Sequence, residues 1–378
     1  MRFAPADDCL DAAVAIGELL AEHAIHGRRD VTWLGMELVG QEADHQVAPL
    51  GHDLYAGTAG VALFLACLGA VTGTTKFTDL AFRAAAGIRA NPSTPSGGFV
   101  GLPSQLYALA HVAALCDDPA VLPPSDPVFA HLTAGAPDSE FDVMFGSAGT
   151  ILGVLAWHAV TGDERALSVA ADHGRHLARH AVRSGDGAMW PAFNGTARLL
   201  LGFSHGAAGI GYALASLSRA LGGHARFAEL AEDAFRCEKA LFGEPHRGFR
   251  TDWCNGAAGI ALSRLGLDDA AAATAVQATV DGPVPPADLL CHGTLGHLLV
   301  VADAAEALDR DDWRAAVSLR LGDVLDGWRC GFAHAASAPE LMTGVSGIGL
   351  GLLRLHRPDI VPQVLRLAPP APAASRGR

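Results

Sequence analysis

The chain has 378 residues, half of them hydrophobic, and its 40 acidic residues outnumber its 27 lysines and arginines to give a net charge of −13. This balance argues against binding to nucleic acid, which depends on clustered basic side chains, and against attraction to anionic membranes. Glycine, histidine or charged residues interrupt every apolar stretch before it reaches the roughly 20 residues of a membrane span, and the N-terminus shows no secretory signal, so we expect a cytoplasmic protein that is not an integral membrane protein.

A glycine-containing segment recurs seven times along the chain, and each copy precedes an apolar stretch with helical periodicity. The Gly-x-x-Gly segments are 57–60, 98–101, 146–149, 206–209, 256–259, 293–296 and 344–347. The helices expected after them cover 61–71, 102–115, 150–160, 210–221, 260–267, 297–308 and 348–356. Helices as apolar as these must be buried on most of their sides.

Most intervals between the glycine segments leave room for a second helix that faces solvent. Four amphipathic segments fit this place, namely 76–90, 164–182, 225–242 and 311–325. The pattern predicts an all-α fold, an α/α barrel (toroid) of seven inner and about seven outer helices. We expect one domain over residues 1–368 and a disordered tail at 369–378. An open solenoid of helical pairs is the alternative, but the inner helices are too apolar to line an open groove.

A closed barrel of this kind would gather all the glycine turns at one end, so residues near different turns would converge. Cys291 and His292 directly precede the sixth glycine segment, and Cys254 precedes the fifth. Two thiols and an imidazole are ligands that zinc accepts, and three protein ligands leave one tetrahedral position open. The alternative is two buried cysteines and a core histidine. The other five cysteines are scattered and do not suggest a disulfide framework.

Three motifs at these turns, together with the repeat, resemble the lanthionine synthetase C-like cyclases. They are Ser204-His205-Gly206, Trp253-Cys254-Asn255-Gly256 and Cys291-His292-Gly293, and the resemblance extends over residues 53–365. Segments 15–27 and 341–349 look most like the C-terminal cyclase domain of class II lanthipeptide synthetases. The resemblance implies an α/α barrel with one Zn²⁺ per chain, held by Cys254, Cys291 and His292. It also implies closure of lanthionine or methyllanthionine rings, in which a cysteine of a dehydrated precursor peptide adds to dehydroalanine or dehydrobutyrine.

The same resemblance implies roles for three further residues. His205 would transfer a proton during the addition, as an imidazole can near neutral pH. Asp142 would orient His205, and Arg250 would stabilise charge on an enolate oxygen. The structural alternatives are a histidine that bonds its own turn, a helix-capping aspartate and an ion pair between Arg250 and Asp252. Relatives often carry tyrosine or histidine where this chain has Asn255, which we interpret as a change in tuning.

Other functions stay open at this point. One is a non-catalytic scaffold that keeps zinc as a structural element and holds a precursor peptide or a dehydratase. Class II synthetases carry a dehydratase region before the cyclase, and these 378 residues contain none. The interpretations left open are an excised domain, a stand-alone cyclase served by a separate dehydratase, and a partner subunit, and the expected partners include a separate dehydratase or transporter. Another is glutathione addition to dehydroamino acids, as in eukaryotic relatives. A site like that of protein prenyltransferase β-subunits is disfavoured by the Cys/Cys/His ligand set and the aromatic content of 6%.

Overall fold

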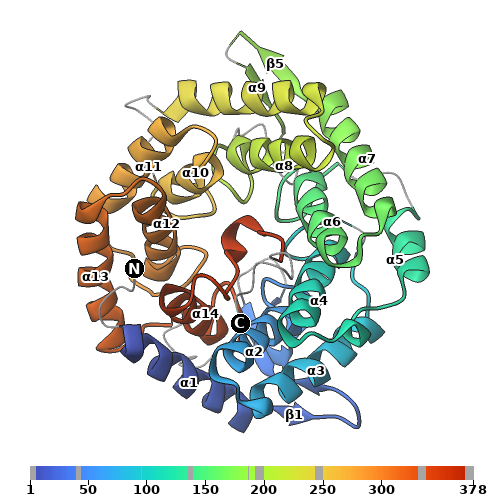
Figure 1. Ribbon diagram of the computed structural model, residues 1–378, viewed down its shortest axis with the longest axis vertical. Helices are drawn as coiled ribbons and strands as arrows, with labels where there is room; N and C mark the ends of the chain where they lie inside the picture. The colour runs from blue at the N-terminus through green and yellow to red at the C-terminus, as the bar shows by residue number, and fades with distance from the viewer. Residues whose placement is uncertain are drawn as a thin grey trace.

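The computed structural model describes residues 6–39, 44–94, 96–134, 139–185, 187–191, 200–242, 250–330 and 338–370. The described residues contain fourteen α-helices, which alternate along the chain between two concentric rings (Figure 1). The inner ring consists of α2 (Thr58–Thr72), α4 (Leu102–Cys116), α6 (Ser147–Thr161), α8 (Ala207–Ala220), α10 (Ala257–Arg264), α12 (Thr294–Ala307) and α14 (Val345–His356). The outer ring consists of α1 (Ala6–Glu22), α3 (Thr75–Ala90), α5 (Ser125–Leu132), α7 (Glu164–His180), α9 (Ala225–Phe242), α11 (Asp269–Asp281) and α13 (Asp311–Leu325).

The inner ring is closed. Each inner helix packs against the inner helices before and after it, and α14 packs against α2. The N-terminal helix α1 packs on α14, so the first helix of the chain covers the last inner helix. These contacts confirm the predicted all-α toroid with seven inner helices. Within the described part of the chain, no helix has both the length and the apolar character needed to cross a membrane.

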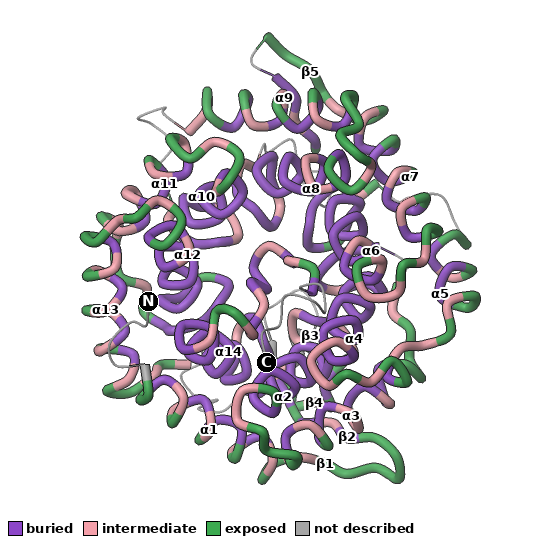
Figure 2. Tube along the Cα trace, viewed as in Figure 1, coloured by how far each residue is buried: buried purple, intermediate pink, exposed green. Residues whose placement is uncertain are grey.

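Burial distinguishes the two rings (Figure 2). In α2 every residue from Thr58 to Gly69 is buried, so this part of the helix is covered on all sides. In α7 the buried residues follow a stripe that includes Ala166, Val169, Ala170 and Leu177, while the opposite face is exposed. The apolar sequences of the inner helices require burial on all sides, and the amphipathic sequences of the outer helices require burial on one side.

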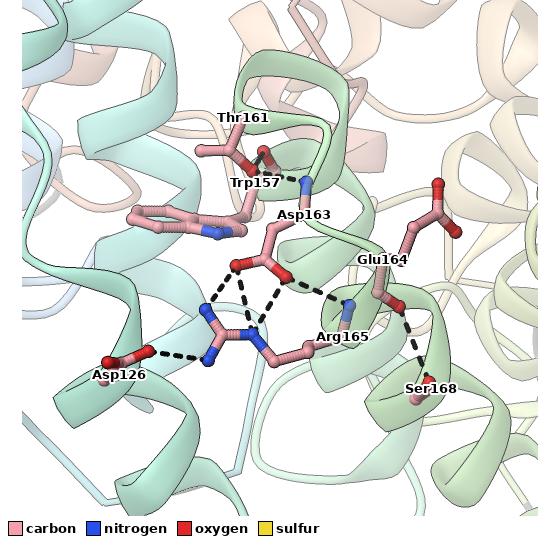
Figure 3. Close-up of polar contacts among 7 residues, drawn as sticks. All are labelled: Asp126, Trp157, Thr161, Asp163, Glu164, Arg165 and Ser168. Carbon is pink, nitrogen blue, oxygen red and sulfur yellow. Dashed lines mark hydrogen bonds and ion pairs between the residues drawn. The ribbon is translucent and has the colours of Figure 1, made fainter.

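The short outer helix α5 is fastened to the start of α7 by one arginine (Figure 3). Asp163 caps α7 by accepting the Arg165 backbone N–H at 3.1 Å. The Arg165 guanidinium bonds Asp163 in return and reaches Oδ1 of Asp126 in α5 at 2.8 Å. It also lies over the ring of Phe129, 4.6 Å from its centroid.

The described residues also form three antiparallel hairpins, which were not predicted from the sequence. They are β1–β2 (Ile25–His26 and Val31–Thr32), β3–β4 (Leu34–Val39 and Asp44–Pro49) and β5–β6 (Val182–Ser184 and Gly187–Met189). The longest, β3–β4, pairs Leu34 with Pro49 at its open end. Its Met36 N–H donates to Glu340 Oε1 at 3.1 Å, which attaches the hairpin to the segment before α14.

The last described segment of the chain lies inside the ring of helices. Residues 357–370 follow α14 into the middle of the barrel, where η3 (Val364–Arg366) lies (Figure 1). Trp253 Nε1 donates to the Leu365 carbonyl at 2.8 Å, so this segment touches the residue beside Cys254. The expected disorder of 369–378 concerns residues that, from 371 onward, lie outside the described part of the chain.

Candidate functional site

Each inner helix begins after a glycine with extended backbone, which we call its cap glycine. The cap glycines are Gly57, Gly101, Gly146, Gly206, Gly256, Gly293 and Gly344. The second repeat differs from the sequence expectation, because its cap glycine is the last residue of 98–101 and not the first. Ser104 therefore occupies the position where the other repeats have their second glycine, and its hydroxyl donates to the Gly101 carbonyl at 2.6 Å.

The second residue before each cap glycine belongs to a ring of backbone hydrogen bonds. We call these residues the ring residues, and they are Tyr55, Phe99, Met144, Ser204, Cys254, Cys291 and Met342. At six junctions the N–H of one ring residue donates to the carbonyl of the next at 3.0–3.3 Å. Among the described residues, no such bond joins Cys254 to Cys291. The predicted convergence of the turns is thus observed, and the two cysteines flank the one open junction.

The side chains of the two cysteines meet across this junction. Each sulfur shifts the titration of the other: the neighbouring Cys291 raises the pKa of Cys254, and the neighbouring Cys254 lowers the pKa of Cys291. The neighbouring His292 and Tyr55 lower the pKa of Cys291 further, whereas the burial of this thiol raises it. Cys291 in turn raises the pKa of His292.

The donor types of this cluster fit zinc, which binds thiolate sulfur and imidazole nitrogen. Cys291 and His292 are adjacent in sequence, and Cys254 lies across the open junction from them. In the described part of the chain, no group of three or more His, Cys, Asp or Glu side chains is already arranged around a common point for a metal ion. Zinc binding would therefore require these side chains to turn toward a common point.

Asp252 is a site residue that sequence reasoning considered only as a partner of Arg250. Its Oδ1 accepts the Asn255 backbone N–H at 2.8 Å and the Cys254 thiol at 3.0 Å. Its Oδ2 lies 2.5 Å from Nε of Arg250, so the ion pair considered for Arg250 is present, and the pKa of Arg250 is raised by this hydrogen bond. The signal in the sequence is an aspartate four residues before the cap glycine, which recurs at Asp53, Asp142 and Asp252.

His205 and Asp142 form a hydrogen-bonded pair on the neighbouring turns. His205 Nδ1 lies 2.7 Å from Asp142 Oδ2, and both side chains are largely buried. The ring of Phe145 stacks on the imidazole, with centroids 5.8 Å apart. The backbone N–H of Ser204, just before the histidine, donates to the Cys254 carbonyl at 3.1 Å. His205 therefore lies on the turn directly beside the one that carries Cys254, and Asp142 lies on the turn beyond it.

The sequence pattern of the family described as "Lanthionine synthetase C-like protein" matches residues 48–366. The chain belongs to this family. Among solved structures, the fold is similar to that of "Nisin cyclase", with a TM-score of 0.63 and 15% identity over 84% of this chain and 91% of that chain. The unsaturated glucuronyl hydrolase from Bacillus sp. GL1 gives a TM-score of 0.47 and 15% identity over 93% and 97%. Identities this low concern the fold alone, and comparison with curated protein sequences gives no match.

Membership in the lanthionine synthetase C-like family agrees with the resemblance of the sequence over residues 53–365. The more specific resemblance to the C-terminal domain of class II synthetases stays a prediction. The zinc ligands Cys254, Cys291 and His292 and the residues His205, Asp142 and Arg250 also stay predictions as far as their roles are concerned.

Proposed function

We propose that this lanthionine synthetase C-like protein is a zinc-dependent cyclase that closes lanthionine or methyllanthionine rings in a dehydrated precursor peptide. One observation supports this most strongly. Cys254 and Cys291 flank the open junction of the turns, and His205, which is hydrogen-bonded to Asp142, stands on the turn next to that of Cys254. The reaction needs a thiol-activating centre and a proton-transfer group close together, and these two clusters supply them.

Cys254, Cys291 and His292 would hold the zinc ion. Zinc bound there would lower the pKa of a peptide thiol so that a thiolate is present at neutral pH. The carboxylate of Asp252 fixes the turn that carries Cys254, because it accepts the Asn255 N–H and binds Arg250. This support fixes the backbone from which the Cys254 side chain would bind the ion.

The addition forms a C–S bond at the β-carbon of the dehydroamino acid and leaves an enolate, whose α-carbon must gain a proton. In our proposal the His205 imidazole accepts the proton that the thiol loses and returns it to the α-carbon, so that protons balance over the cycle. Asp142 holds Nδ1 of the imidazole and stabilises the imidazolium between the two steps. Arg250 would stabilise the negative charge on the enolate oxygen.

The proposal is tested by incubating the protein with a dehydrated, cysteine-containing peptide and counting free thiols by alkylation and mass spectrometry. Ring closure leaves the peptide mass unchanged, so the expected result is loss of alkylation without a mass change. A second arm adds glutathione, and a peptide that gains the mass of glutathione would indicate the intermolecular reaction instead. A peptide that binds but keeps all its thiols would indicate a non-catalytic scaffold and would contradict the proposal.

A further inference from the structure

The residue directly before each cap glycine meets solvent at the end of the barrel where the turns converge. The cap glycine is buried in every repeat, whereas the residue before it is half-buried or exposed. We call these residues the floor residues. Three consecutive repeats carry the apolar Ala56, Val100 and Phe145, and the next four carry His205, Asn255, His292 and Thr343. The floor residues therefore form an apolar arc and a polar arc, and Phe145 and His205 are neighbours at one boundary between the two arcs.

Phe145 is the large side chain of the apolar arc, and it is 38% exposed. Its ring stacks on the His205 imidazole at an interplanar angle of 25°, with centroids 5.8 Å apart. Its backbone N–H donates to Asp142 Oδ1 at 2.7 Å. On another side, a Cβ added to Gly97 would lie 3.0 Å from Phe145 Cα, so the backbone of Gly97 packs directly against it. An exposed aromatic ring on a backbone held in this way is a preformed surface for an apolar group.

The spacing of Phe145 and His205 matches the spacing of side chains along an extended peptide. Phe145 stands on the side of His205 that faces away from Cys254, because the turns follow one another in chain order around the ring. In an extended peptide, side chains two positions apart share a face and are separated by about 6.6 Å. The two rings are 5.8 Å apart. A peptide that presents its dehydroamino acid to His205 therefore presents a side chain two positions away to Phe145.

We propose that Phe145 forms an apolar subsite for the side chain two positions from the reacting dehydroamino acid, so that peptides with an aliphatic or aromatic residue there are preferred. The inference deepens the proposed function and rests on it for the position of the substrate. Val100 and Ala56, on the next two turns, continue the apolar arc away from His205. An apolar side chain laid on the Phe145 ring removes apolar surface from water, which favours binding.

The first measurement is the binding of fluorescent peptides that contain dehydroalanine and no cysteine, so that no ring can form. One pair of peptides has leucine or glutamine two positions before the dehydroalanine, and a second pair has them two positions after it. In one pair the natural protein should bind the leucine peptide about 10-fold more tightly. Phe145→Ala should abolish this preference, and Phe145→Leu, which keeps an apolar side chain, should retain most of it. Leu319→Ala removes an exposed apolar side chain from the outer helix α13 and is the matched control, with no expected effect.

The second measurement compares ring closure in the same pairs of peptides after a cysteine has been added to each. Phe145 stacks on His205, so a role in positioning the imidazole alone would make Phe145→Ala lower the rate equally for both peptides of a pair. The proposal predicts instead that the ratio of kcat/KM for the leucine peptide to that for the glutamine peptide falls about 10-fold, mainly through KM.

An equal loss for both peptides, or a natural protein without a preference in either pair, would overturn the proposal. If no peptide forms a ring, the proposed function fails, and the binding measurement still decides whether Phe145 recognises an apolar side chain.

Discussion

His205 and Asp142 are joined by one oxygen of the carboxylate, since Oδ2 lies 2.7 Å from the imidazole Nδ1. The other oxygen, Oδ1, accepts the Phe145 backbone N–H at 2.7 Å. Asp53 makes the same bond to the Ala56 N–H at 2.8 Å, and Asp252 makes it to its own third neighbour. The aspartate at this position therefore supports the turn in three repeats. In the third repeat, the other oxygen of Asp142 also binds His205.

This relationship predicts the effect of Asp142→Asn. The amide keeps an oxygen for the Phe145 N–H, so the turn should persist, but it lacks the charge that stabilises a protonated imidazole. We expect the cyclisation rate to fall about 100-fold or more with zinc content unchanged. Asp53→Asn makes the same chemical change at the first turn and should leave the rate near that of the natural protein. Equal losses in the two variants, measured by thiol counting, would show that only turn stability is involved.

The ligand assignment predicts zinc content. We expect one zinc per purified chain and nearly none in Cys291→Ala, because removing one thiolate from a set of three protein ligands removes most of the affinity. Cys116→Ala, at the end of α4, changes a half-buried cysteine outside the site and should keep full zinc. The check is elemental analysis by mass spectrometry. Full zinc in Cys291→Ala would exclude this residue as a ligand.

The space around each glycine predicts whether that position tolerates a side chain. A Cβ at Gly209, in the first turn of α8, would overlap the Phe203 carbonyl oxygen, so Gly209→Ala forces the turn apart. We expect the free energy of unfolding to drop by about 2 kcal/mol or more. Gly322 in α13 has open space around it, and Gly322→Ala should stabilise the protein by about 0.5–1 kcal/mol. Urea denaturation compares the two variants, and equal effects would contradict the packing of the turns.

The buried histidine of α12 predicts a dependence of stability on pH. Burial lowers the pKa of His297 to about 4, below the value of 6.5 expected in the unfolded chain. Between these values the unfolded chain binds the proton and the folded chain does not. This group's contribution is therefore complete above pH 6.5 and is lost as the pH falls toward 4. From pH 7 to pH 5 the loss is about 2 kcal/mol.

His297→Gln should remove this part of the acid sensitivity. The variant's own stability at pH 7 is not the readout, because the substitution also changes packing. The readout is the difference in unfolding free energy between pH 7 and pH 5, which should be smaller by about 2 kcal/mol in the variant. If this change in unfolding free energy is the same in both proteins, the folded and unfolded chains bind a proton at His297 equally well, which would contradict the prediction.

The inner helices were predictable because each apolar stretch directly follows a Gly-x-x-Gly segment. The outer helix α11 was not singled out, since its alanine-rich sequence shows little contrast between faces. The cysteine pair and His205 were found because their motifs stand directly before cap glycines. The backbone bonds that join the turns, and the one junction left open between Cys254 and Cys291, depend on which turns become neighbours, and local sequence does not determine this.

Thiol loss measured before and after metal removal tests the account most directly. The protein is treated with a chelator, divided, and assayed on a dehydrated peptide with and without added zinc, next to His205→Asn carrying its full zinc. The account predicts rapid thiol loss with the zinc-restored natural protein and none with the chelated protein. Thiol loss with His205→Asn should be at least 100-fold slower than with the restored protein. Equal thiol loss in the chelated and the restored protein would contradict the claim that zinc at Cys254, Cys291 and His292 activates the thiol.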